Sequence, residues 1–454
     1  MATIIHDQKA LAVNPLKVSQ PMGATLAFLG LARAMPLMHG AQGCTAFGKV
    51  FFANHFREPI PLQTTAMDQV ASILGADESV VEALRVLCAN ERPQAIGLLT
   101  TGLSETQGAD IRRNIVEFRK SYPEFVDIAI IPANTTDTLG CLETGFAIAV
   151  EAMIDTLTPQ ARRKARAHRV NVLASSMLTP GDVDALKDWL DAFGLEANVI
   201  PDLSDSLSGY LTDDGYASLT FGGAPASAIA SAGEAVATLV VGRSLDRAAD
   251  LLHARTGVPD YRFKGLLGLE DCDALTKLLS EISGRPAPAR IERRRAQLLD
   301  AMVDCHFKLS AARIAIAADP DLLFTMSAFL TDLGADIAVA VAPAKSDALD
   351  SVPVDSVRIG DLEDMEGGAK VVNARLILAN SHAAAAATRL GAAHLRIGYP
   401  LYDQIGGYAR EWIGYRGSRQ ALFDVANLLW SQRETIKPYR SIYWQGASRG
   451  VEAV

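Results

Sequence analysis

The sequence predicts an α/β protein built from three doubly wound parallel-sheet domains of the Rossmann-like kind. Short β-rich runs alternate with helical patterns at intervals of roughly thirty residues, which is typical of βαβ units. The chain has 454 residues, a length greater than one hydrophobic core normally organises. Hydrophobic residues make up 49% and charged residues 21% of the chain, as in soluble globular proteins.

Each predicted unit has the order strand, helix, strand. In the first unit these elements are expected at 95–100, 109–120 and 126–132. In the second unit they are expected at 169–174, 182–193 and 196–200, with Gly194 ending the helix. In the third unit they are expected at 312–317, 319–334 and 335–341. Right-handed crossovers would join the strands of each unit into a parallel sheet.

Two breaks in the pattern suggest domain boundaries. The stretch 158–168 is polar and basic, and Gly284–Pro288 is rich in helix-breaking residues. Further strands are expected at 237–242, 375–379 and 394–398, and a long polar helix at 290–309. We therefore expect an N-terminal α/β domain over 1–165, a second over 166–290 and a C-terminal one over 291–454.

Charge and hydropathy exclude several classes of protein. The net charge is −9 at pH 7, whereas a nucleic-acid binder presents a basic face. The best candidate for a membrane span, 145–154, is broken by Glu151. Residues 1–15 lack the basic end and apolar run of a secretory signal. We expect neither nucleic-acid nor membrane binding, and a cytoplasmic location.

The cysteines favour reduced thiols over disulfides. There are five of them, an odd number, and they are scattered through the chain without a CxxC pair: Cys44, Cys88, Cys141, Cys272 and Cys305. This pattern fits neither a disulfide framework nor a zinc site.

Cys44 is the strongest candidate for a metal ligand. Gly40 and Gly43 flank it, and glycine lets backbone come close to a bulky inorganic group. The run 46–52 predicts a buried helix whose N-terminus faces the thiolate and stabilises an anionic iron–sulfur cluster. Such a cluster needs about four protein ligands, so the others would come from another chain. The residues alone also allow the alternative that Cys44 is a buried free cysteine.

Other polar residues have ordinary structural explanations. Thr100–Glu105 follow a predicted strand, where ligands gather in parallel sheets, but they also suit a helix cap. His39 and His55 are near Cys44 in sequence and are expected to be hydrogen-bonding structural residues. The sequence has no phosphate-binding loop and no arrangement that predicts a Ser/His/Asp triad.

Several segments resemble the β-type subunits of the nitrogenase component 1 superfamily, and they extend over nearly the whole chain. They are 14–24, 39–44, 55–59, 61–67, 100–110 and 391–428. The resemblance implies the three-domain nitrogenase component 1 type of fold. The segments 61–67 and 408–410 are most similar to the branch that builds the iron–molybdenum (FeMo) cofactor.

The resemblance also implies which residues meet a cluster. In the catalytic β subunit three cysteines hold an eight-iron cluster; the middle one matches Cys44, but the first falls on Ser19 and the third on Gly102. Serine ligates iron weakly and glycine has no side-chain ligand. The implied group is a [4Fe–4S] cluster at the subunit interface, with Cys44 as its single ligand from this chain. Gly43 and Gly102 would allow close backbone approach, and Cys141 would be a non-ligand neighbour.

The implied function is that of a subunit of the scaffold on which the FeMo cofactor is assembled. Its expected partners are a NifE-like α subunit, in an α2β2 heterotetramer, and the nitrogenase reductase (iron protein), which docks transiently near 67–75. The cofactor precursor would be bound mainly by the α subunit. This chain would position the shared cluster, relay electrons and provide a docking surface for the reductase. It would not catalyse a reaction alone.

Two alternative functions remain open at the level of sequence. The first is the β subunit of a nitrogenase-like reductase, of either the dinitrogenase or the light-independent protochlorophyllide reductase type. The second is a metal-receptor type of binding protein with three α/β domains and no cluster.

Overall fold

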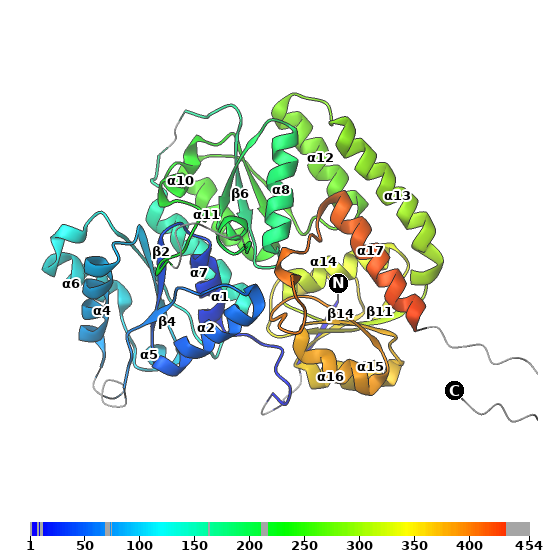
Figure 1. Ribbon diagram of the computed structural model, residues 1–454, viewed down its shortest axis with the longest axis horizontal. Helices are drawn as coiled ribbons and strands as arrows, with labels where there is room; N and C mark the ends of the chain where they lie inside the picture. The colour runs from blue at the N-terminus through cyan, green and yellow to red at the C-terminus, as the bar shows by residue number, and fades with distance from the viewer. Residues whose placement is uncertain are drawn as a thin grey trace, which may run out of the picture.

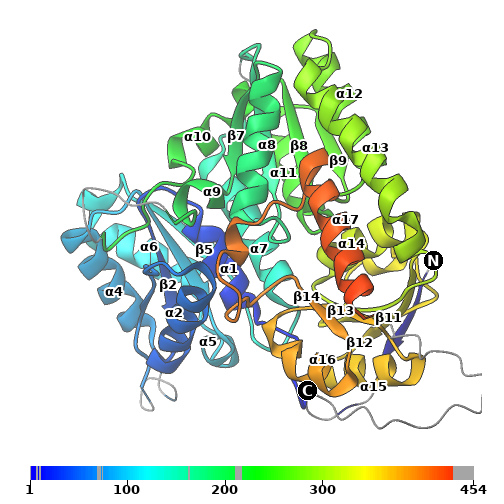
Figure 2. The same cartoon turned by 45° about the vertical axis from the view of Figure 1, so that its right-hand side comes forward.

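Three all-parallel sheets, each flanked by helices, make up the fold (Figure 1 and Figure 2). The structure is a computed structural model that describes residues 2–6, 9, 12–68, 73, 75–161, 164–209 and 217–432. The prediction of an α/β fold with three doubly wound sheets is confirmed.

The first sheet has the strand order β3-β2-β4-β5. Its strands are β2 (Ala34–His39), β3 (Gln63–Thr64), β4 (Ala95–Thr100) and β5 (Ala129–Ala133). Its helices are α1 (Gln20–Leu29), α2 (Gln42–Phe56), α4 (Asp77–Asn90), α5 (Gly102–Thr106), α6 (Ile111–Ser121) and α7 (Leu142–Leu157). Every residue of β2 and β4 is buried, as expected for parallel strands covered on both faces.

The second sheet has the order β7-β6-β8-β9. Its strands are β6 (Arg169–Ala174), β7 (Glu196–Ile200), β8 (Ala237–Val241) and β9 (Asp260–Phe263). Its helices are α8 (Pro180–Ala192), α9 (Leu203–Ser206), α10 (Ala226–Ala230), α11 (Asp246–Thr256) and α12 (Leu269–Ser283). The long helix α13 (Ala289–Leu309) then leads into the third sheet.

The third sheet has the order β1-β12-β11-β10-β13-β14. Its strands are β1 (Thr3–His6), β10 (Arg313–Ala317), β11 (Asp336–Ala342), β12 (Ser356–Ile359), β13 (Leu376–Ala379) and β14 (Ala393–Arg396). Its helices are α14 (Pro320–Asp332), α15 (Leu362–Val372), α16 (Ala384–Leu390) and α17 (Gly414–Ser431). The edge strand β1 comes from the other end of the chain, and Thr3 pairs with Ser356.

The chain therefore starts in the third sheet and crosses to the first. Val13 N–H donates to the Asp361 carboxylate (2.8 Å), and Leu362 N–H donates to the Asn14 carbonyl (2.9 Å). Leu16 is buried in the core of the third sheet. Between them these contacts fix the segment that precedes α1. Apart from β1, each sheet lies within one of the ranges 1–165, 166–290 and 291–454, and the domain boundaries themselves stay a prediction.

Most predicted elements are confirmed, and two were misplaced. Strands β4, β6 and β7 coincide with the predicted runs. The strand predicted at 126–132 begins only at Ala129, because Pro123 starts a 3₁₀ turn before it. The buried helix predicted at 46–52 begins at Gln42 instead, since Ala41 is the last extended residue, and Phe47 on its outer face is 64% exposed.

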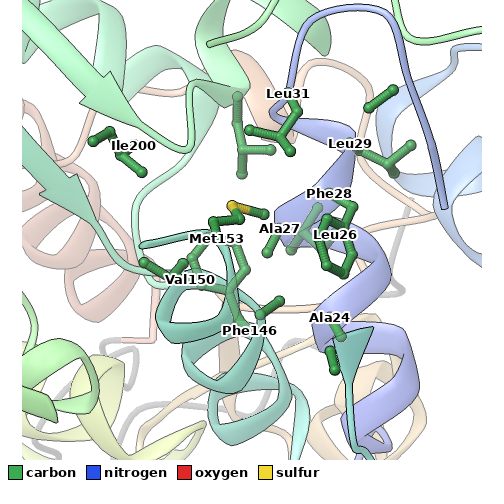
Figure 3. Packing of buried hydrophobic residues seen from close by; sticks show 14 of the residues in the cluster. Ala24, Leu26, Ala27, Phe28, Leu29, Leu31, Phe146, Val150, Met153 and Ile200 are labelled. Atoms are coloured by element: carbon green, nitrogen blue, oxygen red, sulfur yellow. The ribbon is translucent and has the colours of Figure 1, made fainter. Parts of the chain in front are cut away.

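Helices α1 and α7 pack directly against each other at the centre of the molecule. All ten residues of α1 are buried. Met153 of α7 points toward Ala27 of α1 in Figure 3. Small residues let the two backbones meet: a Cβ at Gly23 would overlap the Leu142 carbonyl, and one at Gly145 would overlap the Gln20 carbonyl.

We predict that Gly145→Ala destabilises the protein by about 1–3 kcal/mol, the usual cost of overpacking a tight contact. The added methyl meets backbone atoms that cannot rotate away. The measurement is urea unfolding followed by circular dichroism. Gly367→Ala on α15 is the matched control, because a Cβ there has no atom within 4 Å and alanine favours a helix. Equal stability of the two variants would contradict the prediction.

Candidate functional site

Cys44 lies where the first sheet brings several loops together. Strand β2 ends at His39, and after two loop residues α2 begins, with Cys44 as its third residue. The loop after β4 crosses here: Thr101 Oγ1 donates to the His39 carbonyl (2.9 Å), and a Cβ at Gly40 would lie 2.6 Å from Thr101 Oγ1. Both loops leave the carboxyl ends of parallel strands, the edge where such sheets bind ligands.

An open cavity of about 510 Å³ adjoins Cys44. The cysteine is exposed. The cavity is lined by the segment before α1, by residues of α1, β2 and α2, and by the loops after β4 and β5. His382, which follows β13 of the third sheet, completes the lining. Its lining residues are Pro15, Leu16, Lys17, Val18, Ser19, Pro21, Met22, Met38, Gly43, Cys44, Phe47, Phe51, Thr101, Asp137 and His382.

Two of the three positions that the resemblance compared with cluster ligands line this cavity. Ser19, the residue before α1, and Cys44 face it directly, and Gly102 follows the lining residue Thr101. A Cβ at Gly43 would meet no atom within 4 Å, so the backbone there is open to a bulky group. The close backbone approach assigned to Gly43 and Gly102 stays a prediction.

The space beside Gly102 belongs to Asp137, a residue that sequence reasoning missed. Gly102 N–H donates to Asp137 Oδ2 (2.9 Å), and a Cβ at Gly102 would lie 2.8 Å from the same oxygen. Asp137 comes from the loop after β5. An acidic residue in the loop after a parallel strand is the signal that could have found it.

The thiol of Cys44 is protonated in the free chain at neutral pH. Partial burial raises its pKa, and the negative charge of Asp137 raises it further, while a backbone N–H of the first helical turn lowers it. Ala41, the N-cap of α2, has no polar side chain to satisfy that turn. The helix start therefore favours an anion, and iron binding would stabilise the thiolate that the free chain lacks.

The two nearby histidines are structural. His39 is buried with Nδ1 2.9 Å from Thr65 Oγ1, and burial lowers its pKa. His55 Nδ1 accepts from Leu401 N–H (2.9 Å), and burial lowers its pKa to about 3. His55 is therefore neutral and joins the first sheet's helix α2 to a segment that follows the third sheet.

Cys141 is buried at the start of α7 and is absent from the cavity lining. Its N–H donates to Thr144 Oγ1 (2.8 Å). Burial raises the pKa of its thiol well above the usual value, and the charges of Asp319 and Glu143 raise it further. Its place near a cluster stays a prediction. The remaining cysteines, Cys88, Cys272 and Cys305, are also buried.

Cys44 is the one cysteine among the cavity's lining residues, so this chain offers one thiol there. Within the described ranges, no group of three or more His, Cys, Asp and Glu side chains could hold a metal ion.

No helix in the part of the chain that the structure describes is long and apolar enough to span a membrane.

A family model described as nitrogenase component 1 type oxidoreductase matches residues 19–430. The chain belongs to this family. The match begins at Ser19 of the cavity wall and extends to the last turn of α17.

Curated relatives place the chain more finely within the family. It is 42% identical over 436 residues to the nitrogenase iron-molybdenum cofactor biosynthesis protein NifN of Bradyrhizobium diazoefficiens, covering 96% of this chain and 93% of the relative. It is 43% identical over 442 residues to NifN of Klebsiella pneumoniae, covering 97% and 96%. The resemblance drawn from the sequence motifs is thereby confirmed.

A solved structure supports the fold. A chain of nitrogenase Cp1 at pH 6.5 superposes with a TM-score of 0.88 at 27% identity, covering 96% of this chain and 98% of that one. Family membership and this superposition argue against the metal-receptor alternative.

We predict that a thiol reagent labels Cys44 first in the purified free chain, because the other four cysteines are buried. Since the pKa of Cys44 is raised, the rate at which the reagent labels Cys44 should keep rising as the pH passes the usual thiol pKa. Under native conditions, Ellman's reagent should react rapidly with one thiol per chain. The fast phase should vanish in Cys44→Ala and persist in Cys305→Ala; the reverse result would refute the assignment.

Proposed function

We propose that this chain is a subunit of the scaffold on which the nitrogenase FeMo cofactor is assembled. The observation that carries the proposal is its 42–43% identity, over nearly the full length, to proteins named for FeMo cofactor biosynthesis. The cavity agrees with it, because Cys44 is the one cysteine in the lining and serine and glycine take the other two ligand positions.

The cofactor that we propose at Cys44 is a [4Fe–4S] cluster shared with a partner subunit. A cluster of this type needs four ligands, and Cys44 would supply one of them. When bound, the cluster would supply one-electron transfer. This chain's residues would hold it: Cys44 as ligand, the open backbone at Gly43 for close approach, and the first turn of α2 to stabilise its negative charge.

The proposed partner is a NifE-like α subunit, in an α2β2 heterotetramer, that holds the cofactor precursor. Phe47 and Val50 support this, because they are 64% and 60% exposed on the same face of α2, next to the cysteine. Large exposed apolar side chains are typical of a subunit interface, and here they lie beside a site whose other ligands would come from the partner. The proposed docking segment for the iron protein, 67–75, falls partly outside the described residues, since 69–72 and 74 are not described.

The alternative is a β subunit of a nitrogenase-like reductase. Ser19 and Gly102 argue against dinitrogenase, because an eight-iron cluster would lack two of its thiolates from this chain. The names of the relatives argue for the scaffold over both reductase types. We also propose the cytoplasm as the place of assembly, where the five scattered cysteines would stay reduced.

We predict that the complex co-purified without oxygen contains about four iron and four sulfide per αβ pair in the shared cluster, in addition to any precursor. Cys44→Ala should lower that content or change the EPR signal of the reduced cluster, because the iron loses its ligand from this chain. Cys305→Ala is the control, since this buried cysteine lies outside the cavity. Unchanged iron content, sulfide content and EPR signal in Cys44→Ala would contradict the proposal that Cys44 is a ligand of the shared cluster.

Function is tested with the same preparations. In a mixture with the iron protein, molybdate, homocitrate and cofactor-free dinitrogenase, the wild-type complex should activate the dinitrogenase, and the Cys44→Ala complex should do so far less. Activation that needs no added complex would contradict the scaffold proposal. Partner-dependent reduction of protochlorophyllide would favour the reductase alternative.

We also predict that Phe47→Glu lowers the yield of co-purified partner at least tenfold. A carboxylate buried at an apolar interface costs roughly 2 kcal/mol or more. The measurement is pull-down at equal expression, followed by size-exclusion chromatography. Val116→Glu on α6 is the matched control, because Val116 is 54% exposed and is not one of the residues that line the cavity. Equal losses in both variants would argue against this face.

A further inference from the structure

Asp137 is the acidic residue of the cavity that holds Cys44. It lines the cavity together with Cys44 and Ser19. Its carboxylate is tied to the start of α5, since Oδ2 accepts from Gly102 N–H at 2.9 Å. That bond directs the carboxylate to the position where a side chain at residue 102 would otherwise lie.

The loop that carries Asp137 is held on two sides. Thr135 N–H donates to Thr100 Oγ1 (2.7 Å), and Thr135 Oγ1 donates to the Thr100 carbonyl (2.6 Å), at the end of β4. Thr136 N–H donates to Gln20 Oε1 (3.1 Å), at the start of α1. These bonds hold the loop in place, so the Asp137 carboxylate has a fixed position in the cavity wall although the residue is exposed.

Three side chains of the cavity lining can carry charge besides the Cys44 thiol. They are Asp137, Lys17 and His382. Lys17 Nζ donates to the Thr138 carbonyl (3.1 Å), next to Asp137 in the chain. Burial lowers the pKa of His382 and so favours its neutral form. Asp137 and Lys17 are thus the two fixed charges of opposite sign on this wall.

We propose that Asp137 is an electrostatic positioning residue that lowers the reduction potential of the cluster bound at Cys44. The proposal rests on the proposed function, because it presupposes the shared cluster. Reduction adds one electron to the cluster, from a low-potential one-electron donor such as the iron protein or dithionite. No bond forms or breaks and no proton moves. The added negative charge meets the Asp137 carboxylate across the cavity, and that repulsion disfavours the reduced state.

Asp137 acts without ligating iron in this proposal. Its Oδ2 is engaged by the Gly102 N–H, and Cys44 occupies the ligand position of this chain. A side chain at position 102 would meet this carboxylate, because its Cβ would lie 2.8 Å from Asp137 Oδ2. Asp137 therefore places a negative charge next to the proposed cluster.

The test is an EPR-monitored redox titration of the co-purified complex carrying Asp137→Asn. Asparagine keeps an oxygen that can accept from Gly102 N–H and removes the charge. At the potential where half of the wild-type cluster is reduced, the reduced-to-oxidised ratio should rise about fivefold, the order expected for one charge across a partly exposed site. Lys17→Gln should shift the ratio in the opposite direction. Asp300→Asn, an exposed carboxylate on α13, should leave it unchanged.

The outcomes separate this proposal from the function it rests on. A wild-type complex without a cluster would contradict the proposed function. An intact cluster with the wild-type midpoint in Asp137→Asn would overturn the role of Asp137. So would loss of the cluster, or changed EPR g-values, in that variant, because either would make Asp137 a ligand or a packing residue. If the Asp137→Asn complex fails to assemble, the Lys17→Gln titration decides. A lower reduced-to-oxidised ratio would support electrostatic control by this wall of the cavity, and an unchanged or higher ratio would overturn it.

Discussion

The site depends on one close contact, the backbone approach of α1 to α7. Glycines at positions 23 and 145 let each helix press against the other's carbonyl groups. This contact fixes the start of α1, where Gln20 bonds both to Thr144 of α7 and to the loop before Asp137. Ser19 and Asp137 consequently reach the same cavity as Cys44. A side chain between the helices would move two walls of the cavity at once.

A second constraint joins the three sheets through buried carboxylates. Glu143 of α7 accepts from Asp321 N–H of α14 (2.8 Å), and the Asp321 carboxylate accepts from the N–H groups of Arg243 and Ser244 after β8 (both 3.1 Å). Burial raises the pKa of Glu143 well above its usual value, and the charge of Asp321 raises it further. Both effects favour the neutral form of Glu143, which avoids placing two adjacent charges in the interior.

Sequence periodicity was sufficient for the elements whose stabilising contacts are local. Strands such as β6 and β7 carry β-forming Val, Leu and Ile residues on either side of a well-marked helix, and these were placed correctly. Strand β1 was missed because its four residues are stabilised by β12, more than three hundred residues away. The start of α2 was missed because no capping side chain marks it. Cys44, Ser19 and Gly102 were identified by family motifs, whereas Asp137 was missed, because an acidic residue in a loop after a strand is a weak signal and its position depends on how that loop folds.

The entry of β1 into the third sheet has a consequence for biosynthesis. The wall formed by 15–19 is held by contacts to Asp361 and Leu362 and by the pairing of β1 with β12. These partners leave the ribosome only after four-fifths of the chain has been made. Cys44 is thus synthesised early but faces a complete cavity late. For the cluster proposed at Cys44, the wall formed by 15–19 is in place only after residues 356–362 have been made.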